Sequence, residues 1–483
     1  MARIDISYRN ILRIATPVLL STVSFTAMGI IDTIMVGRLG VLELAAVGLG
    51  NLLTWWFLSF FFGLLGGVNA FVAQFYGADR PDRLGAVVWQ GLYLALASGL
   101  LVASCWFLAP TVFSWTGAEP AMQRIATEYS QLRLLGGFGL TLLVLADNVY
   151  RGLGRTEIPM FAAWLQLALN CLFNYALIFG ELGAPALGAR GAALGTVAAQ
   201  TLVGVALLGS LFARSSLRRR YRLASTWRFD PGLFRRLVLV SLPIGVQFFM
   251  EMGGVSIFTA LVARLGDAAM AATNAVLQVY SVAFMLGAAL AVSATTLVGQ
   301  CLGARQRDDV RLVVDRIWRI GFVITAALGI LYLAFPRRIL AVFVSETSRA
   351  EDVLAWAQPL FVVVVFCMFF ELRFNLLSGA LRGAGDTRYS MLTNIGSAWL
   401  LFVPLVVFVT PRWGLLGAWW CLVVHVAVMS TLLQLRYRRD GWLHRLVQDE
   451  AAEGGRPAAA VASGGGGEGS DEIESAAREA LVG

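Results

Sequence analysis

The chain has 483 residues, of which 58% are hydrophobic and only 14% are charged. Its mean hydropathy of +0.72 excludes an ordinary soluble globular domain. The formal net charge is +8 and every basic residue is Arg, which raises the question of a nucleic-acid partner. The distribution of these Arg residues along the chain favours a membrane instead.

Apolar stretches follow one another along most of the chain. Each is about 20 residues or longer, which is enough for a helix to cross a bilayer core of roughly 30 Å. There are twelve: 14–37, 44–73, 84–109, 130–150, 158–180, 191–213, 237–263, 268–299, 318–343, 355–381, 389–411 and 413–435. The first stretch is long and is followed at once by another, so we expect no cleavable signal peptide. The pattern predicts an all-α polytopic membrane protein.

Arg residues are distributed unevenly between alternate loops. The N-terminus, the even-numbered loops and the proximal C-terminus hold 26 of them, whereas the odd-numbered loops hold 8. The positive-inside rule therefore predicts that both termini are cytoplasmic. The richest cluster, 213–236, is expected to set this topology, with contact to anionic lipid headgroups as an additional role. After about residue 447 the sequence becomes rich in Gly, Ala, Ser and acidic residues, and we expect disorder there.

An internal repeat divides the chain into two halves. At a numbering offset of 226, identical residues align at these pairs: Pro17 and Pro243, Arg38-Leu39-Gly40 and Arg264-Leu265-Gly266, Gln74 and Gln300, Gly77 and Gly303. At an offset of 231, "RGLGRT" (151–156) aligns with "RGAGDT" (382–387). Each half holds six spans, so both cross the membrane in the same sense. We expect two six-helix lobes related by a pseudo-twofold axis along the membrane normal, with a central cleft.

This repeat gives the predicted domain organisation. The predicted segments are an N-lobe at 1–213, a cytoplasmic basic linker at 214–236, a C-lobe at 237–446 and a disordered tail at 447–483. Two similar bundles that rock about a shared cleft are typical of alternating access, so the repeat favours a transporter.

Few ionisable residues lie inside the apolar stretches, and charges at such depth are functional candidates by default. The ones we identify are Asp32, Asp147, Glu251, Glu371 and Arg373. Asp147 precedes Arg151 by four residues, which is typical of a surface ion pair on one helix. Glu251 and Glu371 are candidates for ion coupling, and a buried structural network is the alternative. Arg373 points about 200° away from Glu371 around the helix, so it either pairs with another acid or extends toward the membrane surface.

Asp32, in "GIIDTIMVG", has candidate polar neighbours on other spans. Asn170 and Asn174 are four residues apart and share one helix face, and Thr196 lies on the next span. Such groups also serve as hydrogen-bonding glue between helices, and this alternative remains open. Burial favours a protonated carboxyl, whereas water or a cation favours the carboxylate. These acids therefore suit coupling to H⁺ or Na⁺.

Other chemistry has little support. The five Cys residues are scattered through the spans with no C-x-x-C pair, so we interpret them as packing residues. His425 is alone on an apolar helix and is also expected to pack. No phosphate loop or HExxH motif is present, so an enzyme is not expected. Trp55 and Tyr280 could stack on flat cationic ligands if they face the cleft, or act as anchors at the membrane interface.

Taken in order, several motifs resemble the MATE (multidrug and toxic compound extrusion) family, in its bacterial NorM/DinF-like branches. The resemblance covers about residues 8–440. The motifs are "ATPVLLS", "IIDTIMVGRLGVLELAAVGLGN", "VAQFYGA", "NYALIFGELGAPALGARGAALGT", "SLPIGVQFFME" and "SGALRGAGDT". The family implies twelve helices in two lobes and the export of cationic or amphipathic compounds in exchange for Na⁺ or H⁺.

The resemblance also implies site residues. Asp32 matches the acid of the first helix, and the positions that line the N-lobe cation site are matched by Asn170, Asn174 and Thr196. Glu251 and Glu371 match the acids of the seventh and tenth helices in the C-lobe site, with Glu371 where the family often has Asp.

Two positions depart from the family pattern. Asn174 is an amide where some members have an acid, and Cys367 stands where an aromatic hydroxyl is expected near the C-lobe acids.

We therefore predict a secondary active antiporter, a monomer in the bacterial inner membrane, that needs no cofactor beyond its coupling ion. Its expected partners are small organic cations or amphipathic compounds and the lipid bilayer, not nucleic acid. Two alternatives are a flippase for lipid-linked saccharides, which needs a cationic cleft, and a polytopic membrane enzyme. Asp32 has no counterpart in the second half, because the equivalent position is Phe258.

Overall fold

The computed structural model describes residues 3–340 and 350–443, and the predicted tail at 447–483 lies outside them. These described residues form one compact unit. Among the described residues, all regular secondary structure is helical and there is no β-strand. The fold class predicted from the apolar stretches is therefore confirmed.

The helices of the first half are α1 (Tyr8–Gly37), α2 (Val41–Gly66), α3 (Val68–Gly77), α4 (Pro81–Ser104), η1 (Cys105–Leu108), α5 (Ala109–Ser114), α6 (Pro120–Leu135), α7 (Gly137–Gly152), α8 (Glu157–Phe179), α9 (Ala189–Ala213) and α10 (Ser215–Arg220). Those of the second half are α11 (Pro231–Ala263), α12 (Asp267–Gly303), α13 (Arg307–Ala334), α14 (Pro336–Leu340), α15 (Ala350–Ala357), α16 (Leu360–Gly383), α17 (Thr387–Gly396), η2 (Ser397–Phe402), α18 (Val403–Arg438) and η3 (Asp440–Trp442).

Among the described residues, ten helical segments are long and apolar enough to cross a membrane, and the pair α6 and α7, bent by 49°, makes an eleventh. One of the ten is the 52-residue segment Thr387–Arg438. At 1.5 Å per residue it is about 78 Å long, more than twice a bilayer core. Gly414, with φ 61° and ψ −151°, interrupts it. Its two parts correspond to the last two of the twelve predicted stretches.

Helix ends follow capping groups rather than hydropathy. α1 begins at Tyr8 because Ser7 Oγ accepts a hydrogen bond from the N–H of Asn10 at 3.2 Å. α11 begins at Pro231, where Asp230 accepts from the N–H of Leu233 at 3.0 Å. The apolar stretches therefore predicted the membrane-crossing parts and began several residues inside these helices.

The internal repeat is present in the backbone geometry. Gly40 and Gly266, which the offset of 226 aligns, both have positive φ, 149° and 105°. Asp79 and Arg305, at the same offset, are non-glycine residues with φ of 54° and 60°. Non-glycine residues seldom adopt this conformation, so its recurrence at the same offset supports a true repeat.

Hydrogen bonds repeat as well. Thr156 Oγ1 donates to the carbonyl of Ile14 at 3.0 Å, and Thr387 Oγ1 donates to the carbonyl of Val240 at 2.7 Å. The donors align at the offset of 231 and the acceptors at the offset of 226. Each acceptor lies three residues before the proline inside α1 or α11, where the helix lacks one backbone N–H. The threonine of each repeated motif thus donates a hydrogen bond to the backbone of α1 or α11, close to the proline inside that helix.

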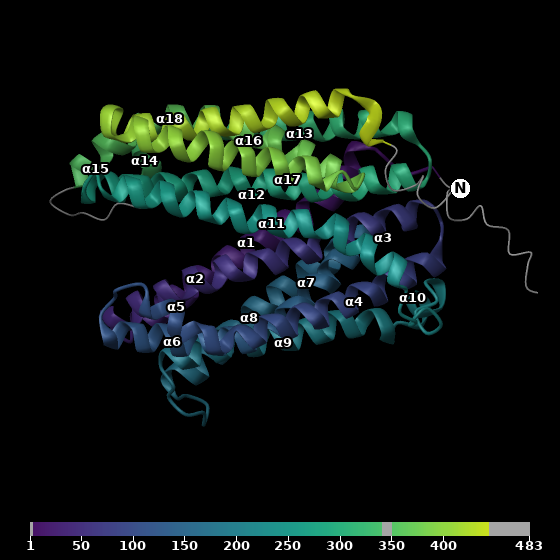
Figure 1. Ribbon diagram of the computed structural model, residues 1–483, viewed down its shortest axis with the longest axis horizontal. Coiled ribbons are helices and arrows are strands. Elements are labelled where there is room, and N and C mark those ends of the chain that lie inside the picture. The colour runs from purple at the N-terminus through teal and green to yellow at the C-terminus, as the bar shows by residue number, and fades with distance from the viewer. Residues whose placement is uncertain (1–2, 341–349, 444–483) are drawn as a thin grey trace, which may run out of the picture. The chain divides into compact units, whose positions relative to one another are not determined.

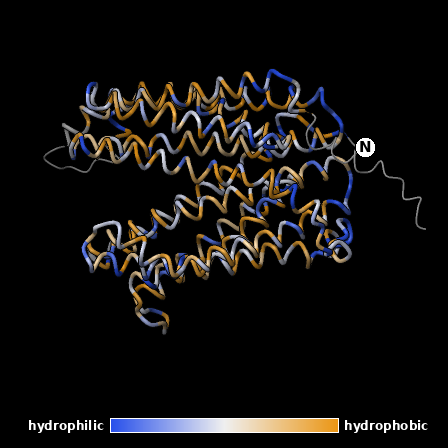
Figure 2. Tube along the Cα trace, viewed as in Figure 1, coloured by the Kyte–Doolittle hydropathy of each residue, from blue (hydrophilic) through white to orange (hydrophobic). Residues whose placement is uncertain are grey.

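The two halves form an N-lobe (α1–α9) and a C-lobe (α11–α18). In Figure 1 the green and yellow helices of the C-lobe lie on one side of the unit and most purple and blue helices of the N-lobe on the other. The lobes meet where α11 packs on α2 and where α12 packs on α1 and α3. Figure 2 shows hydrophobic residues along the helices and hydrophilic residues mainly toward their ends. The domain boundaries at 213, 236 and 446 remain a prediction.

The interlobe contact (Gln74, Gly77, Gln300 and Gly303) follows the same symmetry. Gln74 Nε2 donates to the carbonyl of Gly383 at 2.8 Å, and Gln300 Nε2 donates to the carbonyl of Gly152 at 3.0 Å. Each glutamine therefore binds the glycine of the repeated "RGxG" motif in the opposite lobe.

Two glycines allow this close approach. A Cβ added at Gly77 would lie 2.0 Å from the carbonyl oxygen of Gln300, and one added at Gly303 would lie 1.9 Å from that of Gln74. The contact joins the lobes at the end that carries the loops between α3 and α4 and between α12 and α13.

Candidate functional site

The N-lobe site is a chain of hydrogen bonds from Asp32 of α1 through Asn174 and Asn170 of α8 to Thr196 of α9. Asn174 Nδ2 donates to Asp32 Oδ1 at 2.7 Å and lies 3.3 Å from Asn170 Oδ1. Asn170 Nδ2 donates to Thr196 Oγ1 at 3.2 Å. The structure thus brings together all four residues predicted for this site.

Burial changes along this chain. Asn170 and Asn174 are fully buried, whereas Asp32 is half-buried. Asn174 Oδ1 is buried without a hydrogen-bond partner. A Cβ added at Gly195 of α9 would lie 2.1 Å from that oxygen, so the missing side chain makes room for Asn174. An unpaired buried oxygen beside a carboxylate provides a further group that can bind a cation.

Arg133 of α6 is a residue that sequence reasoning missed. Its side chain is 8% exposed, and Nη1 donates to Gln200 Oε1 of α9 at 3.2 Å. Its positive charge acts electrostatically on the Asp32 carboxylate. Arg133 lies inside the apolar stretch 130–150, and a single Arg within an apolar run was the available signal.

The C-lobe site centres on Glu371 of α16, which is 5% exposed. Tyr280 of α12 donates its hydroxyl to Glu371 Oε2 at 3.0 Å. Asn375 Nδ2, one helical turn from Glu371, donates to Oε1 at 2.7 Å. Cys367 Sγ lies 3.7 Å from the Tyr280 hydroxyl. The family pattern places an aromatic hydroxyl at position 367, where this chain has Cys367. Here Tyr280, on a neighbouring helix, provides such a hydroxyl to the site.

Glu251 of α11 interacts with the same site through its charge. Its carboxylate acts electrostatically on Glu371, and the Arg382 guanidinium acts on Glu251. Arg382 also lies over the ring of Phe248, 5.6 Å from the centroid. Sequence reasoning used Arg382 only as part of a motif and missed it as a neighbour of Glu251, because the two belong to different helices.

The two aromatic candidates for the cleft have different surroundings. Tyr280 belongs to the C-lobe site through its bond to Glu371. Trp55 packs within the N-lobe against Phe25 and Phe62, with ring centroids 5.8 and 6.1 Å apart. Trp55 lies near the middle of α2 rather than near its ends, which does not fit an interfacial anchor. A substrate role for Trp55 and Tyr280 remains a prediction.

Two other candidate residues, Asp147 and His425, have clear structural partners. Asp147 and Arg151 form the predicted ion pair at 2.8 Å, but both side chains are 16% exposed, so the pair is largely buried rather than on the surface. His425 Nδ1 lies 2.8 Å from Ser397 Oγ, and its ring packs on Phe402 at 5.0 Å. These contacts agree with a packing role for His425.

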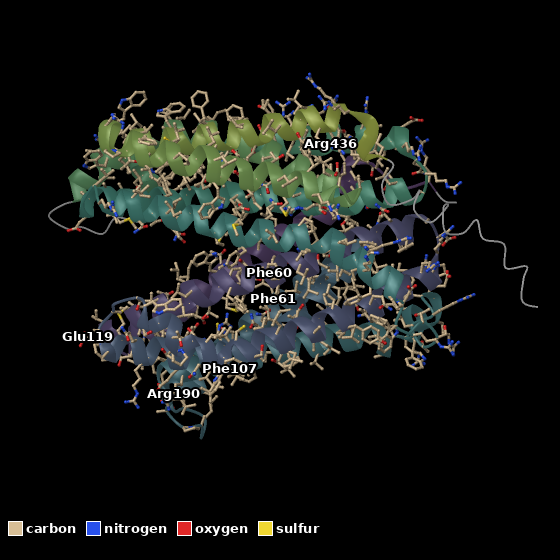
Figure 3. All side chains as sticks on the ribbon, in the orientation of Figure 1. Phe60, Phe61, Phe107, Glu119, Arg190 and Arg436 are labelled. Carbon is tan, nitrogen blue, oxygen red and sulfur yellow. The ribbon has the colours of Figure 1, made fainter. Side chains whose placement is uncertain are left out.

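The cysteines and two further Arg residues, Arg436 and Arg373, are placed as follows. All five cysteines are free. Among the described residues, no group of three His, Cys, Asp or Glu side chains is placed to hold a metal ion. Arg436, labelled in Figure 3, pairs with the buried Asp386 at 2.8 Å. Arg373 lines a pocket among α13, α16 and α18.

Similarity to proteins with curated names covers nearly the whole chain. A "Probable multidrug resistance protein NorM" from Thermotoga maritima is 26% identical over 444 residues, which is 91% of this chain and 94% of that protein. A protein of the same name from Pasteurella multocida is 26% identical over 440 residues, covering 89% and 94%.

Solved structures share the fold at low sequence identity. A MOP superfamily transporter from Pyrococcus furiosus superposes with a TM-score of 0.80 at 19% identity, covering 89% of this chain and 95% of that one. The outward-facing conformation of a multidrug resistance MATE family transporter gives 0.78 at 20% identity, covering 89% and 95%. Both comparisons support the two-lobe, all-helical fold.

The MatE family model matches the chain twice, at residues 17–176 and 243–408. The two matches begin at Pro17 and Pro243, a pair that the offset of the internal repeat aligns. Together they cover more than half of the chain. The chain belongs to the MatE family.

Proposed function

We propose that this protein is a multidrug efflux transporter that exports cationic or amphipathic compounds in exchange for H⁺ or Na⁺. We place it in the bacterial inner membrane with both termini in the cytoplasm. The curated relatives carry the name of a multidrug resistance protein, which supports the substrate class. The excess of Arg in alternate loops supports the orientation.

The observation that carries this proposal is the hydrogen-bonded chain from Asp32 to Thr196 inside a lobe of membrane helices. Asn174 donates to the Asp32 carboxylate, which stabilises its negative charge without neutralising it. A proton or Na⁺ would neutralise that charge. Since Asp32 is half-buried, exposure of its carboxylate to one side or the other would change its affinity for the ion.

Transport further requires that the cleft open to each side in turn. In this proposal the interlobe contact closes the cytoplasmic side. Opening there requires that the two glutamine bonds, Gln74 to Gly383 and Gln300 to Gly152, be broken. The C-lobe acids Glu251 and Glu371 act as a second ion-responsive group. The Glu371 carboxylate accepts hydrogen bonds from two neutral donors, Tyr280 and Asn375, and it interacts electrostatically with Glu251.

The flippase alternative depends on a cationic cleft, for which Arg373 was the only predicted support. Every residue around Arg373 in its pocket comes from the C-lobe helices α13, α16 and α18. This position does not support a cleft between the lobes, so the efflux proposal is favoured.

Efflux of a fluorescent organic cation from proteoliposomes tests the proposal, with Na⁺ and H⁺ gradients imposed separately. We expect one gradient to drive efflux by the wild type and Asp32→Asn to reduce it about tenfold. Asp82→Asn is the matched control, because Asp82 is exposed in the first turn of α4 and should leave efflux unchanged. Full gradient-driven efflux by Asp32→Asn would show that Asp32 does not couple the ion.

A further inference from the structure

A pocket on the C-lobe is lined by three Arg residues and lies apart from the acid sites described above. It has a volume of about 440 Å³ and is lined by residues of α13, α16 and α18. α16 packs on both α13 and α18, so it forms the floor between them. The lining residues are Arg311, Val314, Asp315, Trp318, Arg373, Leu376, Leu377, Gln434, Tyr437 and Arg438.

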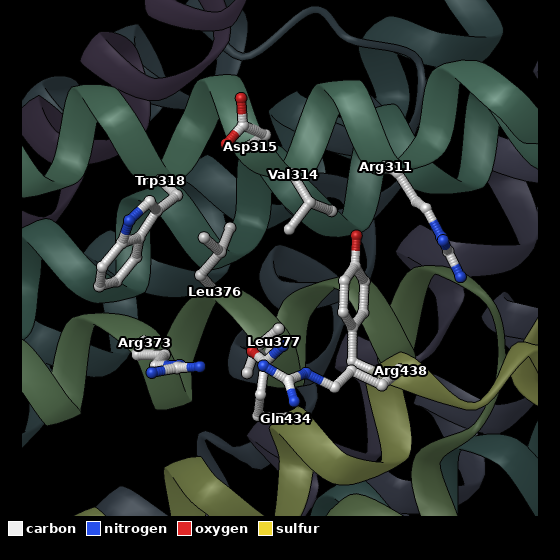
Figure 4. A pocket seen from close by; sticks show the side chains of 10 residues that line it. Arg311, Val314, Asp315, Trp318, Arg373, Leu376, Leu377, Gln434 and Arg438 are labelled. Carbon is white, nitrogen blue, oxygen red and sulfur yellow. The ribbon is translucent and has the colours of Figure 1, made fainter.

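Two of the cations in this pocket have no partner among the described side chains. Among the described side chains (3–340, 354–439 and 441–443), neither Arg373 nor Arg438 forms a hydrogen bond or an ion pair. Figure 4 shows their guanidinium groups pointing toward one another across the pocket. Two unpaired guanidinium groups that converge on one space repel each other unless an anion lies between them.

The acid in the pocket does not supply that anion. Asp315 forms an ion pair with Arg319 of the same helix at 2.8 Å, in an i, i+4 arrangement. Arg319 is not part of the pocket lining, so the carboxylate is partly neutralised from outside. The pocket therefore keeps an excess of positive charge.

In the proposed orientation, the pocket lies toward the cytoplasmic ends of α16 and α18. Arg438 is the last residue of α18, and Arg373 is ten residues from the end of α16, about 15 Å along its axis. A long Arg side chain at this depth extends toward the membrane surface with its stem along apolar groups. Trp318 and Tyr437 are of the types enriched at membrane interfaces. Leu376 and Leu377 give the floor an apolar surface.

We propose that this pocket binds the phosphodiester headgroup of an anionic phospholipid such as phosphatidylglycerol, with Arg373 and Arg438 on the phosphate. The guanidinium groups match phosphate oxygens in geometry and charge. The volume is many times the roughly 30 Å³ of one water, which leaves room for the glycerol beside the phosphate. Basic pockets between membrane helices on the cytoplasmic side are a known means of recognising such lipids.

Native mass spectrometry of the full chain in detergent tests this proposal, by titration with phosphatidylglycerol and, separately, with phosphatidylcholine. We expect preferential binding of phosphatidylglycerol, and a loss of about fivefold in its affinity for Arg373→Gln or Arg438→Gln. Arg235→Gln is the matched control, because Arg235 is an exposed Arg of α11 outside the pocket. It removes the same charge and should leave the affinity unchanged.

Arg438 is exposed at a helix end, so its replacement should not disturb folding, and the thermal midpoint without lipid verifies this. Equal binding of both lipids, or equal losses in all three variants, would overturn the proposal. A third arm measures thermal stabilisation by inorganic phosphate alone. If phosphate stabilises the wild type as much as phosphatidylglycerol does, and Arg373→Gln abolishes both effects, the ligand is a free phosphate and the lipid assignment is wrong.

Discussion

The interlobe contact and the acid sites differ in how they follow the internal repeat. At the interlobe contact, Gln74 and Gln300 make equivalent bonds to equivalent glycines of the opposite lobe. At the acid sites the equivalence is lost. The position equivalent to Asp32 is Phe258, which is 3% exposed and packs on Phe402 and Trp419 with ring centroids 6.0 and 5.8 Å apart.

The reverse comparison gives the same result. The position equivalent to Glu371, at the offset of 231, is Leu140, which is buried. Each lobe therefore has an apolar side chain where the other has its acid. Symmetry is retained at the contact between the lobes and lost at the two acid sites. The duplicated part of the chain is the scaffold, whereas the buried acids are specific to each lobe.

The largest effect is expected from closing the space that the interlobe glycines leave. In Gly77→Ala or Gly303→Ala, the new methyl group would meet a backbone carbonyl at about 2 Å. Because backbone cannot move aside as a side chain can, each change should destabilise the contact by about 3 kcal/mol. The expected result is a similar, large loss of efflux in both variants. A loss in only one of them would contradict the symmetry, and Gly66→Ala, where the added Cβ meets nothing, is the control.

Replacing the amide that donates to each acid tests which of the two acids couples the ion. Asn174 donates to Asp32 and Asn375 donates to Glu371, both at 2.7 Å. A hydrogen bond to a charged group contributes about 1.5–3 kcal/mol. If the N-lobe site dominates coupling, Asn174→Ala should reduce gradient-driven efflux by about tenfold and Asn375→Ala by much less. Initial efflux rates in proteoliposomes measure this, and the opposite order would assign coupling to the C-lobe.

The repeated threonines should give a smaller and symmetric effect. Thr156→Val and Thr387→Val each remove a hydroxyl that binds a helix carbonyl, at 3.0 and 2.7 Å. Each should lower stability by about 1 kcal/mol, since one neutral hydrogen bond is lost. Thermal unfolding in detergent measures the shift, with the exposed Thr431 changed to Val for comparison. Unequal shifts at 156 and 387 would indicate that the two motifs no longer have the same role.

Much of this fold could be predicted from the sequence. Span positions follow from hydropathy, and the repeat was visible in residues such as Gln74 and Gln300 because each serves the same contact. The exact helix ends could not be predicted, because they depend on single capping side chains such as Asp230.

The sites were only partly predictable, for a physical reason. Asn170 and Asn174 share a helix face, so their meeting follows from helical geometry. Arg133 and Arg382 act on acids of other helices, and no pattern within one helix indicates such a neighbour. The Tyr280 hydroxyl likewise binds Glu371 from another helix. It provides the aromatic hydroxyl that the family pattern places at position 367, where this chain has Cys367.

The most direct test of the Asp32 assignment is the affinity of the purified protein for a fluorescent organic cation, measured as the concentration of H⁺ and, separately, of Na⁺ is varied. If the substrate and the ion exchange at linked sites, each must weaken the binding of the other by the same factor. We predict that one ion weakens substrate binding to the wild type about tenfold, and that Asp32→Asn binds substrate with little dependence on either ion. The double variant Glu251→Gln, Glu371→Gln should keep most of the dependence. An unchanged ion dependence in Asp32→Asn would contradict the central role of Asp32.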